Sequence, residues 1–321
     1  MKPDIFNVLI AGVGQIGSRY LQGLARCRLP LRIFVQDCQQ QPLDRARCRW
    51  IEVRGTGIWH DVSFHLSLES IPQLVDIAIV ATTADVRSNV VKEISNYSGV
   101  RYWVLEKVLA QSESKLDELI SSVNNGSKAW VNTPRRVMPW HREIKSHLGL
   151  QRPLTLEVEG GLWGLASNAV HFLDLCAWWT GETIVSVSTE RLSSLWSESN
   201  RPGFREVSGT LKALFSDGSR VLLSADKNKT QSTLKVSDRH MFWQIDETQG
   251  LARSSDGIEI SGRFLLQSEM TSTIIESILT VGRCDLPTLS ESVAIHRVFI
   301  RGMQKHWEQS CKNSATDVPI T

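Results

Sequence analysis

The sequence has no apolar run long enough to cross a membrane, and it carries little net charge. No hydrophobic stretch reaches the roughly 18–20 residues that a transmembrane helix needs. Strand-like residues begin almost directly after Met1–Asp4, which leaves no room for a signal peptide. A net charge of +2 is too small to favour nucleic acid or an anionic membrane as a partner. We therefore expect a cytoplasmic protein that binds neither.

The sequence also lacks paired cysteines. Its six cysteines are scattered, without a CxxC pair or any metal-like spacing, and they are Cys27, Cys38, Cys48, Cys176, Cys284 and Cys311. This distribution predicts reduced thiols and argues against both a disulfide framework and a structural zinc site. We expect no bound metal.

The chain of 321 residues is longer than one hydrophobic core usually organises, which predicts two domains. In the first half, short apolar runs typical of buried strands alternate with stretches of helical periodicity. The predicted strands cover residues 6–11, 31–36, 76–81, 102–106 and 129–132, and the predicted helices cover 18–28, 84–97 and 112–123. This alternation predicts an α/β fold with a doubly wound parallel sheet of the Rossmann type over residues 1–135.

The pattern changes after about residue 150. Segments of alternating apolar and polar residues predict strands at 154–163, 183–192, 206–215, 219–225 and 232–246, with helices at about 168–180 and 290–307. Such strands, joined by turn signals like Ser216-Asp217-Gly218, predict a large, mostly antiparallel open sheet. We place a C-terminal α/β domain at 136–321 and consider that its last helix packs back on the first domain.

A glycine-rich loop directly follows the first predicted strand and opens a helix, which is the setting of a dinucleotide-binding loop. Gly12 permits the tight turn, Gly14 lets the backbone approach a pyrophosphate, and Gly17 allows close packing of helix on strand. Gln15 and Ile16 lie within this loop, and the N-terminus of the helix that follows faces the phosphates. A glycine turn without a ligand is the alternative.

Asp37 ends the second predicted strand, twenty residues after Gly17. A carboxylate at this place accepts hydrogen bonds from the adenosine ribose hydroxyls and repels a 2′-phosphate, which favours NAD over NADP. NADP stays open, because Arg32 and Arg45 lie near enough in sequence to meet a 2′-phosphate.

With the glycine loop, three further stretches resemble the glucose–fructose oxidoreductase / inositol dehydrogenase / MocA (Gfo/Idh/MocA) family. Val80–Thr83 ends a strand where the family often has Thr-Pro near the nicotinamide. Leu105–Val108 is similar to the family's Glu-Lys-Pro signature. Asn168–Asp174, followed by Trp178–Gly181, is similar to the His-x-x-Asp helix and the "W-x-x-G" that closes it.

The resemblance implies an NAD(P)-dependent oxidoreductase that acts on a CH–OH group or carbonyl of a sugar, cyclitol or sugar nucleotide. It also implies that the outer face of the second sheet forms a homodimer or homotetramer. The residues expected to bind the cofactor are Gly12, Gly14, Gln15, Ile16, Gly17, Asp37, Ala81, Thr82, Thr83, Glu106 and Lys107.

The chain departs from the family pattern at three positions. Val108 replaces the usual proline, Ser167 stands where many members have an aspartate, and Arg87 stands where the family often has histidine. The neighbouring Asn168 can hydrogen-bond a substrate but cannot serve as an ionised base. These departures motivate an alternative, a cofactor-binding sensor or regulatory protein that has lost catalysis.

Hydride transfer to a carbonyl requires a proton donor, and the reverse reaction requires a base. His171 is the first candidate, because its ordinary pKa near 6.5 suits both directions. Asp174 lies three residues later on the same helical face and can orient the imidazole or touch the substrate. Lys107 follows a strand at the carboxyl edge of the sheet, where it can polarise the substrate oxygen, relay a proton or bind the nicotinamide ribose. Glu106 contacts the cofactor ribose or packs locally.

Each residue also has a purely structural interpretation. His171 would then be a buried core residue, and Lys107 would be a surface residue at the end of a strand.

The segment Asn132-Thr133-Pro134-Arg135-Arg136 follows the last Rossmann strand and should face the same edge. Two adjacent arginines can bind a carboxylate or phosphate in bidentate fashion, which predicts an anionic substrate such as a sugar nucleotide or an acidic sugar. Similar segments in members of the family suggest a role in surface-polysaccharide sugar biosynthesis. The alternative is that the segment is a solvated basic linker. The predicted substrate-binding residues are Asn132, Arg135, Arg136, Trp163, Asn168 and His171.

Trp163, Trp178 and Trp179 flank the proposed catalytic helix. Their faces suit stacking on a sugar, although we expect at least two of them to pack in the core. A third functional hypothesis is an enzyme that holds NAD tightly and uses it as a redox relay for elimination, hydrolysis or epimerisation.

Replacing Asp37 with alanine should weaken binding of NAD far more than binding of NADP, because the lost carboxylate contacts only the unphosphorylated ribose. Dissociation constants for both cofactors, measured on wild type and Asp37→Ala, check this. An unchanged preference would refute the ribose assignment.

Overall fold

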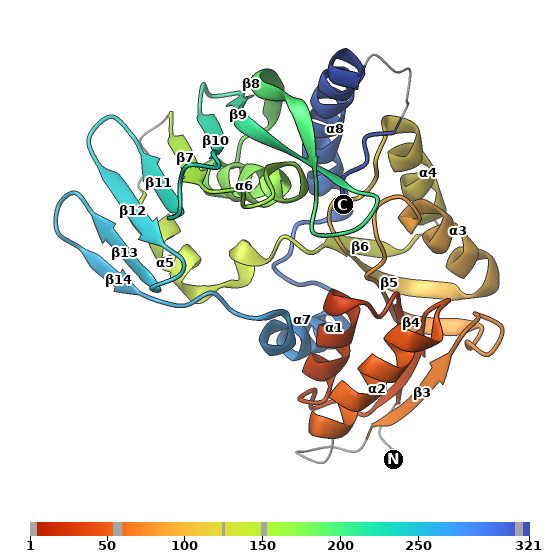
Figure 1. Cartoon of the computed structure of the whole chain (residues 1–321). Coiled ribbons are helices and arrows are strands. Elements are labelled where there is room, and N and C mark those ends of the chain that lie inside the picture. Colours follow the sequence, from red (N-terminus) through yellow and green to blue (C-terminus); the bar gives the residue numbers. More distant parts are fainter. Residues whose placement is uncertain (1–4, 54–59, 124–125, 149–152, 312–316) are drawn as a thin grey trace. The chain divides into compact units, whose positions relative to one another are not determined.

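The N-terminal strands form one six-stranded sheet in the computed structural model (Figure 1). The structure describes residues 5–53, 60–123, 126–148, 153–311 and 317–321. The strands are β1 (Phe6–Ala11), β2 (Leu31–Gln36), β3 (Asp61–His65), β4 (Leu74–Val80), β5 (Gly99–Leu105) and β6 (Lys128–Val131). They lie in the order β3-β2-β1-β4-β5-β6 with every neighbouring pair parallel, so the predicted Rossmann-type sheet is confirmed.

The central strands are apolar because helices cover the sheet. The last four residues of β1, β4 and β5 are all buried, without alternation, as expected of parallel strands covered on both faces. The connecting helices are α1 (Gln15–Leu24), α2 (Gln40–Val53), α3 (Arg87–Tyr97) and α4 (Glu113–Val123). Among the elements up to β6, α2 and β3 went unpredicted. The apolar residues of α2 are few among charged ones, and β3 is an edge strand with no fully buried residue.

The strand order reverses between β1 and β4. In open α/β sheets, ligands bind outside the carboxyl ends of the strands at such a reversal. Gly12 follows β1 and Ala81 follows β4, so the predicted cofactor segments meet at this place.

The second sheet has eight strands in the order β14-β13-β12-β11-β7-β10-β9-β8. Only the β7–β10 pair is parallel among these neighbours, which confirms the predicted large, mostly antiparallel sheet. The strands are β7 (Thr155–Gly160), β8 (Ile184–Glu198), β9 (Arg205–Phe215), β10 (Arg220–Ala225), β11 (Thr233–Ser237), β12 (Phe242–Asp246), β13 (Leu251–Ser254) and β14 (Glu259–Ser261). The helical elements that follow β6 are η1 (Pro134–Val137), α5 (Pro139–His147), α6 (Leu165–Thr180), α7 (Gln267–Val281) and α8 (Leu289–Cys311). Helix α6 packs on β9 and β10.

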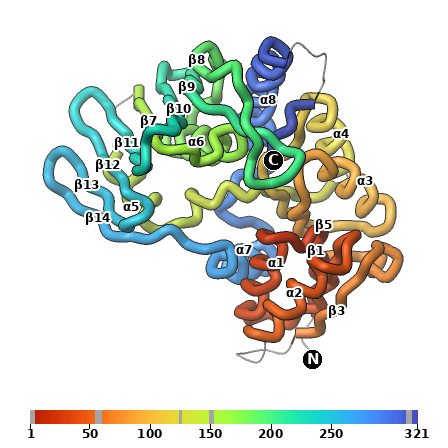
Figure 2. Tube along the Cα trace, in the orientation of Figure 1, coloured from red at the N-terminus to blue at the C-terminus, as the bar shows by residue number. Residues whose placement is uncertain are grey.

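The chain divides into two compact units, and it passes between them more than once. The first unit contains residues 1–109, 117–132 and 265–289, and the second contains 110–116, 133–264 and 290–321. The junction between Asn132 and Thr133 lies close to the expected boundary at 135, but the segment 265–289 returns to the first unit. Helix α7 therefore lies beside α1, although the two are far apart in sequence (Figures 1 and 2). The last helix, from residue 290 onward, groups with the second unit.

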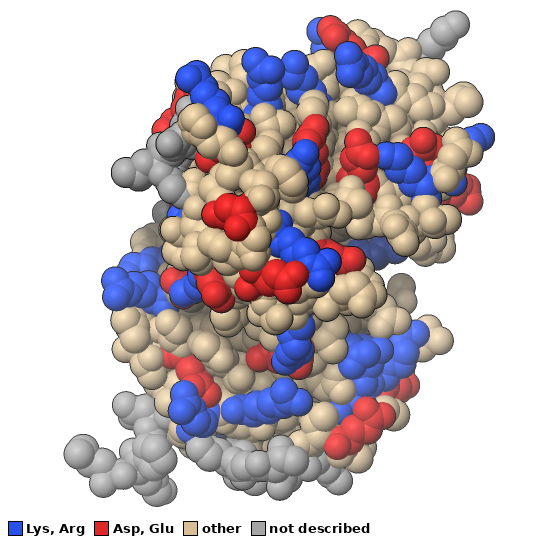
Figure 3. Space-filling model, turned by 90° about the vertical axis from the view of Figure 1, so that its left-hand side faces the viewer, with Lys and Arg blue, Asp and Glu red and all other residues tan. Residues whose placement is uncertain are grey.

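No helix within the described ranges is long and apolar enough to cross a membrane. Basic and acidic side chains lie among one another over the face shown in Figure 3, in keeping with the small net charge. All six cysteines are free thiols.

Helix α7 can approach α1 closely because Gly23 has no side chain. A Cβ at Gly23 would lie 2.6 Å from the Thr271 Cβ and 2.8 Å from the Ser268 carbonyl oxygen. Gly23→Ala should lower the free energy of unfolding by about 1–3 kcal/mol, because the overpacking outweighs the better helix propensity of alanine.

A drop in Tm measured by calorimetry checks this, with the half-exposed Gln22→Ala on the same helix as the control. An unchanged or higher Tm for Gly23→Ala would contradict the close contact.

Candidate active site

The glycine loop has the geometry that a dinucleotide requires. Gly12 has φ of 83°, and a Cβ there would lie 2.7 Å from Thr82 Cγ2. A Cβ at Gly17 would lie 1.9 Å from the Gly12 carbonyl oxygen. Gly14 is different, because a Cβ there would meet nothing within 4 Å. The backbone at Gly14 is therefore open beside the N-terminus of α1, which fits a pyrophosphate.

Asp37 lies beside this loop and is bound to it. Its Oδ2 accepts a hydrogen bond of 2.9 Å from the Val13 amide, and its Oδ1 accepts one of 3.0 Å from the Gln39 amide. Each oxygen keeps an acceptor position for a ribose hydroxyl. Arg32 pairs instead with Asp61 at 3.5 Å. Since Arg32 is near the start of β2 and Asp37 follows its end, the two are about 16 Å apart along the strand, so Arg32 does not serve the ribose site.

Arg49 of α2 reaches the first turn of α1 and is a residue that the sequence did not reveal. Its Nη2 donates to Gln15 Oε1 at 2.9 Å, and its Nη1 donates to the Ser18 hydroxyl. Burial, together with the nearby charge of Arg19, lowers the pKa of Arg49. The contact depends on α2, a helix without a clear periodic signal.

Arg87 ties together the two loops that follow β4 and β5. Its guanidinium donates to the carbonyl oxygens of Thr82 and Val108, and the side chain is almost fully buried. Arg87 therefore holds the Val80–Thr83 and Leu105–Val108 segments in a fixed register. The Thr82 hydroxyl is buried and has no partner among the described residues, so it is available to a bound group at this edge.

Glu106 belongs to a buried polar network in the first unit. Its Oε1 accepts hydrogen bonds from the Tyr20 hydroxyl at 2.8 Å and from Asn132 Nδ2 at 2.5 Å. Asn132 Nδ2 also donates to Gln267 Oε1 at 2.8 Å. Burial, then the charge of Glu106, raises the pKa of Tyr20 well above its usual value. Of the two expected roles of Glu106, the structure shows local packing. The ribose contact stays a prediction, as does substrate binding by Asn132, whose Oδ1 has no partner among the described residues.

Lys107 lies two residues after the end of β5, which places it at the carboxyl edge of the sheet. The peptide bond between Lys107 and Val108 is cis.

In the second unit, a carboxylate from β9 fixes the start of α6. Glu206 accepts hydrogen bonds from the amides of Ala166 at 2.8 Å and Ser167 at 3.2 Å, and from the Ser167 hydroxyl. The N-cap residue Gly164 has φ of 78°. Ser167, one of the departures noted above, thus has a structural partner that binds the first turn of the helix carrying His171 and Asp174.

A cavity of about 340 Å³ lies beside this helix. It is lined by Arg135, Val158, Trp163, Asn168, His171, Phe172, Ser232, Thr233, Leu234, Ile245, Glu247, Thr248 and Phe264. Four predicted substrate-binding residues therefore meet here, namely Arg135, Trp163, Asn168 and His171. Aromatic surface with a few polar groups is typical of a small-molecule site.

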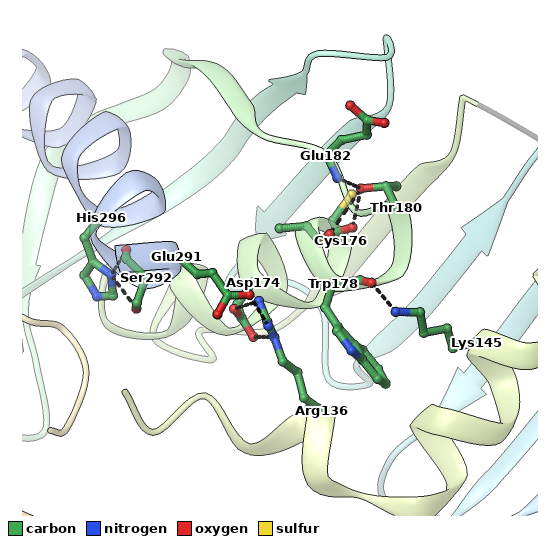
Figure 4. Close-up of polar contacts among 11 residues, drawn as sticks. Arg136, Lys145, Asp174, Cys176, Trp178, Thr180, Glu182, Glu291, Ser292 and His296 are labelled. Atoms are coloured by element: carbon green, nitrogen blue, oxygen red, sulfur yellow. Dashed lines mark hydrogen bonds and ion pairs between the residues drawn. The ribbon is translucent and has the colours of Figure 1, made fainter. Parts of the chain in front are cut away.

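Arg136 does not line this cavity. Its Nη2 and Nε donate to the two Asp174 oxygens at 2.6 and 3.0 Å, and its Nη1 donates to Glu291 of α8 at 2.9 Å (Figure 4). Burial raises the pKa of Asp174 to about 6, and the charge of Arg136 limits that rise. The predicted bidentate geometry is therefore present, but the bound carboxylate is Asp174. The roles of Asp174 toward His171 or substrate stay predictions.

Arg135 is paired as well. Its Nε and Nη2 donate to Glu247 at 2.8 and 2.6 Å, and His141 Nε2 lies 2.9 Å from Glu247 Oε1. The Arg135 guanidinium lies over the Phe172 ring at 4.2 Å from its centroid. Both predicted arginines therefore already face carboxylates, which reduces the positive charge that an anionic substrate would meet.

The three tryptophans have different surroundings. Trp163 lines the cavity and donates from Nε1 to the Ser224 carbonyl at 2.9 Å. Trp179 is buried in the core. Trp178 is covered by Lys145, whose Nζ lies 4.4 Å from the ring centroid and donates to the Trp178 carbonyl at 2.6 Å (Figure 4). Of the three, Trp179 has the expected place in the core, whereas Trp163 and Trp178 are half-buried.

Within the described ranges, no group of three His, Cys, Asp or Glu side chains is placed to bind a metal ion.

No protein-family profile matches the chain, and no curated protein matches it in sequence. Solved structures do match its fold. UDP-N-acetylglucosamine 3-dehydrogenase from Acidithiobacillus ferrooxidans is 16% identical with a TM-score of 0.68, over 94% of this chain and 96% of that one. GenD2 from gentamicin A biosynthesis, in complex with NAD, is 15% identical with a TM-score of 0.67, over 98% and 96%.

A third solved structure is the super-repressor mutant of Gal80p from Saccharomyces cerevisiae. It is 13% identical with a TM-score of 0.71, over 95% of this chain and 96% of that one. The neighbours are of the Gfo/Idh/MocA type that the sequence motifs resemble, and at these identities they establish the fold.

Removing the guanidinium of Arg136 should destabilise the protein in a pH-dependent way. In Arg136→Met, Asp174 stays buried without its partner, which costs about 3–5 kcal/mol where the carboxyl is ionised. Because burial already holds the pKa of Asp174 near 6 with the arginine present, loss of the arginine raises it further. The variant's deficit should therefore be largest at pH 8 and shrink as pH falls toward 6, because the carboxyl of the variant takes up a proton at its raised pKa.

Denaturant unfolding of wild type and Arg136→Met at pH 5 and pH 8 checks this, with the exposed Arg253→Met as the control for loss of a surface ion pair. A deficit that is equal at both pH values would contradict the assignment.

Proposed function

We propose that the chain is an NAD-dependent oxidoreductase that transfers a hydride between the nicotinamide and a CH–OH or carbonyl group of a sugar-like substrate. The observation that carries this proposal is the Asp37 carboxylate bound to the Val13 amide beside the open backbone at Gly14. This arrangement suits a pyrophosphate and an unphosphorylated ribose. The NAD bound in GenD2 supports the same cofactor. NADP remains the second choice, with Arg45 as the residue to meet a 2′-phosphate.

The nicotinamide would accept or supply the hydride. The chain's own residues handle the proton and the substrate. His171 holds or releases the proton of the reacting oxygen, and Lys107 polarises that oxygen or binds the nicotinamide ribose. Arg87 acts on this chemistry indirectly, because it fixes the carbonyl of Val108 next to Lys107.

For the substrate, we propose a sugar, cyclitol or sugar nucleotide, in line with the dehydrogenase of UDP-N-acetylglucosamine among the neighbours. A role in surface-polysaccharide sugar biosynthesis and an acidic sugar as substrate remain proposals from the Asn132–Arg136 segment. We further propose that the chain works in the cytoplasm as a homodimer or homotetramer formed through the C-terminal sheet.

A second candidate is a regulatory protein that binds the cofactor without turnover. The Gal80p neighbour and the departures at Val108 and Ser167 favour it. An NAD relay for epimerisation or elimination is the third.

An assay of the purified protein with NAD and a panel of sugars, cyclitols and sugar nucleotides distinguishes the three candidate functions. Steady accumulation of NADH supports the dehydrogenase. Product formation without net NADH supports the relay, and NAD binding without turnover supports the regulatory protein. Absence of NAD and NADP binding would refute all three.

His171→Ala should lower turnover by roughly 10²–10⁴-fold, because the reacting oxygen loses its proton donor or base. Steady-state kinetics of the variant check this, with the exposed His240→Ala as the matched control. A loss of less than tenfold would reassign His171 to substrate binding or packing.

A further inference from the structure

Glu247 lines the cavity, although no sequence motif identified it. It follows β12 in the turn that leads to β13, and Asp246 shapes that turn. The Asp246 Oδ1 accepts hydrogen bonds of 2.9 Å from the amides of Thr248 and Gln249, and its carbonyl accepts one of 2.8 Å from Gly250. With the turn fixed by Asp246, the Glu247 side chain lines the cavity and is only 20% exposed.

Glu247 is held as an ionised carboxylate. Burial alone would raise its pKa, but the charge of Arg135 and hydrogen bonds from His141 and Arg135 outweigh it, so the pKa lies well below its usual range. Burial lowers the pKa of His141, which is fully enclosed, so its ring is neutral at pH 7 and donates from Nε2. The Glu247 charge therefore faces the opposite charge of Arg135 at pH 7.

The pair keeps both an acceptor and a donor for a ligand. Oε1 of Glu247 accepts two hydrogen bonds and Oε2 accepts one, whereas a carboxylate has about four acceptor positions. Arg135 uses Nε and Nη2 for Glu247, and its Nη1 has no hydrogen-bond partner among the described residues. An acceptor at Oε2 thus lies next to donors at the Arg135 guanidinium.

Among the described residues, the rest of the cavity lining contains no other lysine, arginine, aspartate or glutamate, and His171 is its one further titratable residue. Apolar side chains, among them Trp163, Phe172 and Phe264, form part of the wall, and Ser232 and Thr248 add hydroxyl groups. The Trp163 and Phe172 rings meet edge to face, with centroids 5.5 Å apart. Such a wall suits the apolar face of a sugar ring. An added anion would face the Glu247 carboxylate at short range.

We propose that Glu247 and Arg135 together bind two neighbouring hydroxyl groups of a neutral, polyhydroxylated ring, and that this cavity disfavours a carboxylate on that ring. One hydroxyl donates to Glu247 Oε2 while its neighbour accepts from the guanidinium. The inference rests on the proposed function, since it names the substrate class of the same site, and it reverses the anionic preference that two adjacent arginines suggest in the sequence.

The test uses two matched pairs of probes, D-glucose with D-glucuronate and D-galactose with D-galacturonate. Each pair differs only at C6, which is a hydroxymethyl group in the neutral sugar and a carboxylate in the acid. Binding to the full-length protein is measured by calorimetry with and without NAD, and NAD binding is measured separately. Wild type should bind the neutral member of each pair at least tenfold more tightly.

Glu247→Gln removes the negative charge that pairs with the Arg135 guanidinium. We expect it to weaken binding of the neutral sugars by about 10- to 100-fold, the worth of a hydrogen bond to a charged group, and to reverse the preference toward the acids. Glu247→Asp keeps the charge and should keep the neutral preference. The matched control is Glu259→Gln, which breaks an exposed glutamate–arginine pair on the same sheet outside the cavity. It should change neither affinity nor preference.

The outcomes separate this inference from the proposed function. If NAD fails to bind, the proposed function fails, while the sugar preference measured without NAD still tests the cavity. If NAD binds but wild type prefers the acids, or binds none of the four probes, the inference is overturned. An unchanged preference in Glu247→Gln also overturns it. Should that variant not fold, the wild-type preference decides alone.

Discussion

A buried guanidinium needs a carboxylate, and this requirement organises the second unit. Arg135 and Arg136 are adjacent in η1 and are both buried. Arg136 joins η1 to Asp174 of α6 and Glu291 of α8, and Arg135 joins it to Glu247 in the turn after β12. Losing one partner would leave an uncompensated buried charge, which is far more costly than losing an exposed pair. One short segment thereby fixes the helix that carries His171 and the turn that lines the cavity.

Features encoded by local spacing were predictable from the sequence. The alternation of strands and helices predicted the parallel sheet. The three glycines predicted a loop whose geometry needs Gly12 and Gly17 and leaves the backbone open at Gly14. The convergence of Trp163, Asn168 and His171 on one cavity also follows from neighbouring positions at the start of one helix. In each case the information lies within about one turn or strand.

Features that depend on distant partners were not predictable. Asp174 lies 38 residues from Arg136, Glu291 lies 155 residues from it, and Glu247 lies 112 residues from Arg135. No local pattern shows whether an arginine faces a ligand or a side chain of its own protein. The role of Arg49 was not predictable either, because its helix has few apolar residues. The role of Arg87 depends on the loops after β4 and β5 lying side by side, which no local pattern shows.

The return of residues 265–289 to the first unit affects how the protein can be dissected and how it is made. A fragment that stops at residue 135 would contain all six parallel strands but not α7, so the Gly23 face of α1 would meet water. The first unit is therefore complete only once the chain has been synthesised to residue 289. Neither unit is a contiguous stretch of the chain, so neither can be exchanged between proteins as a single segment.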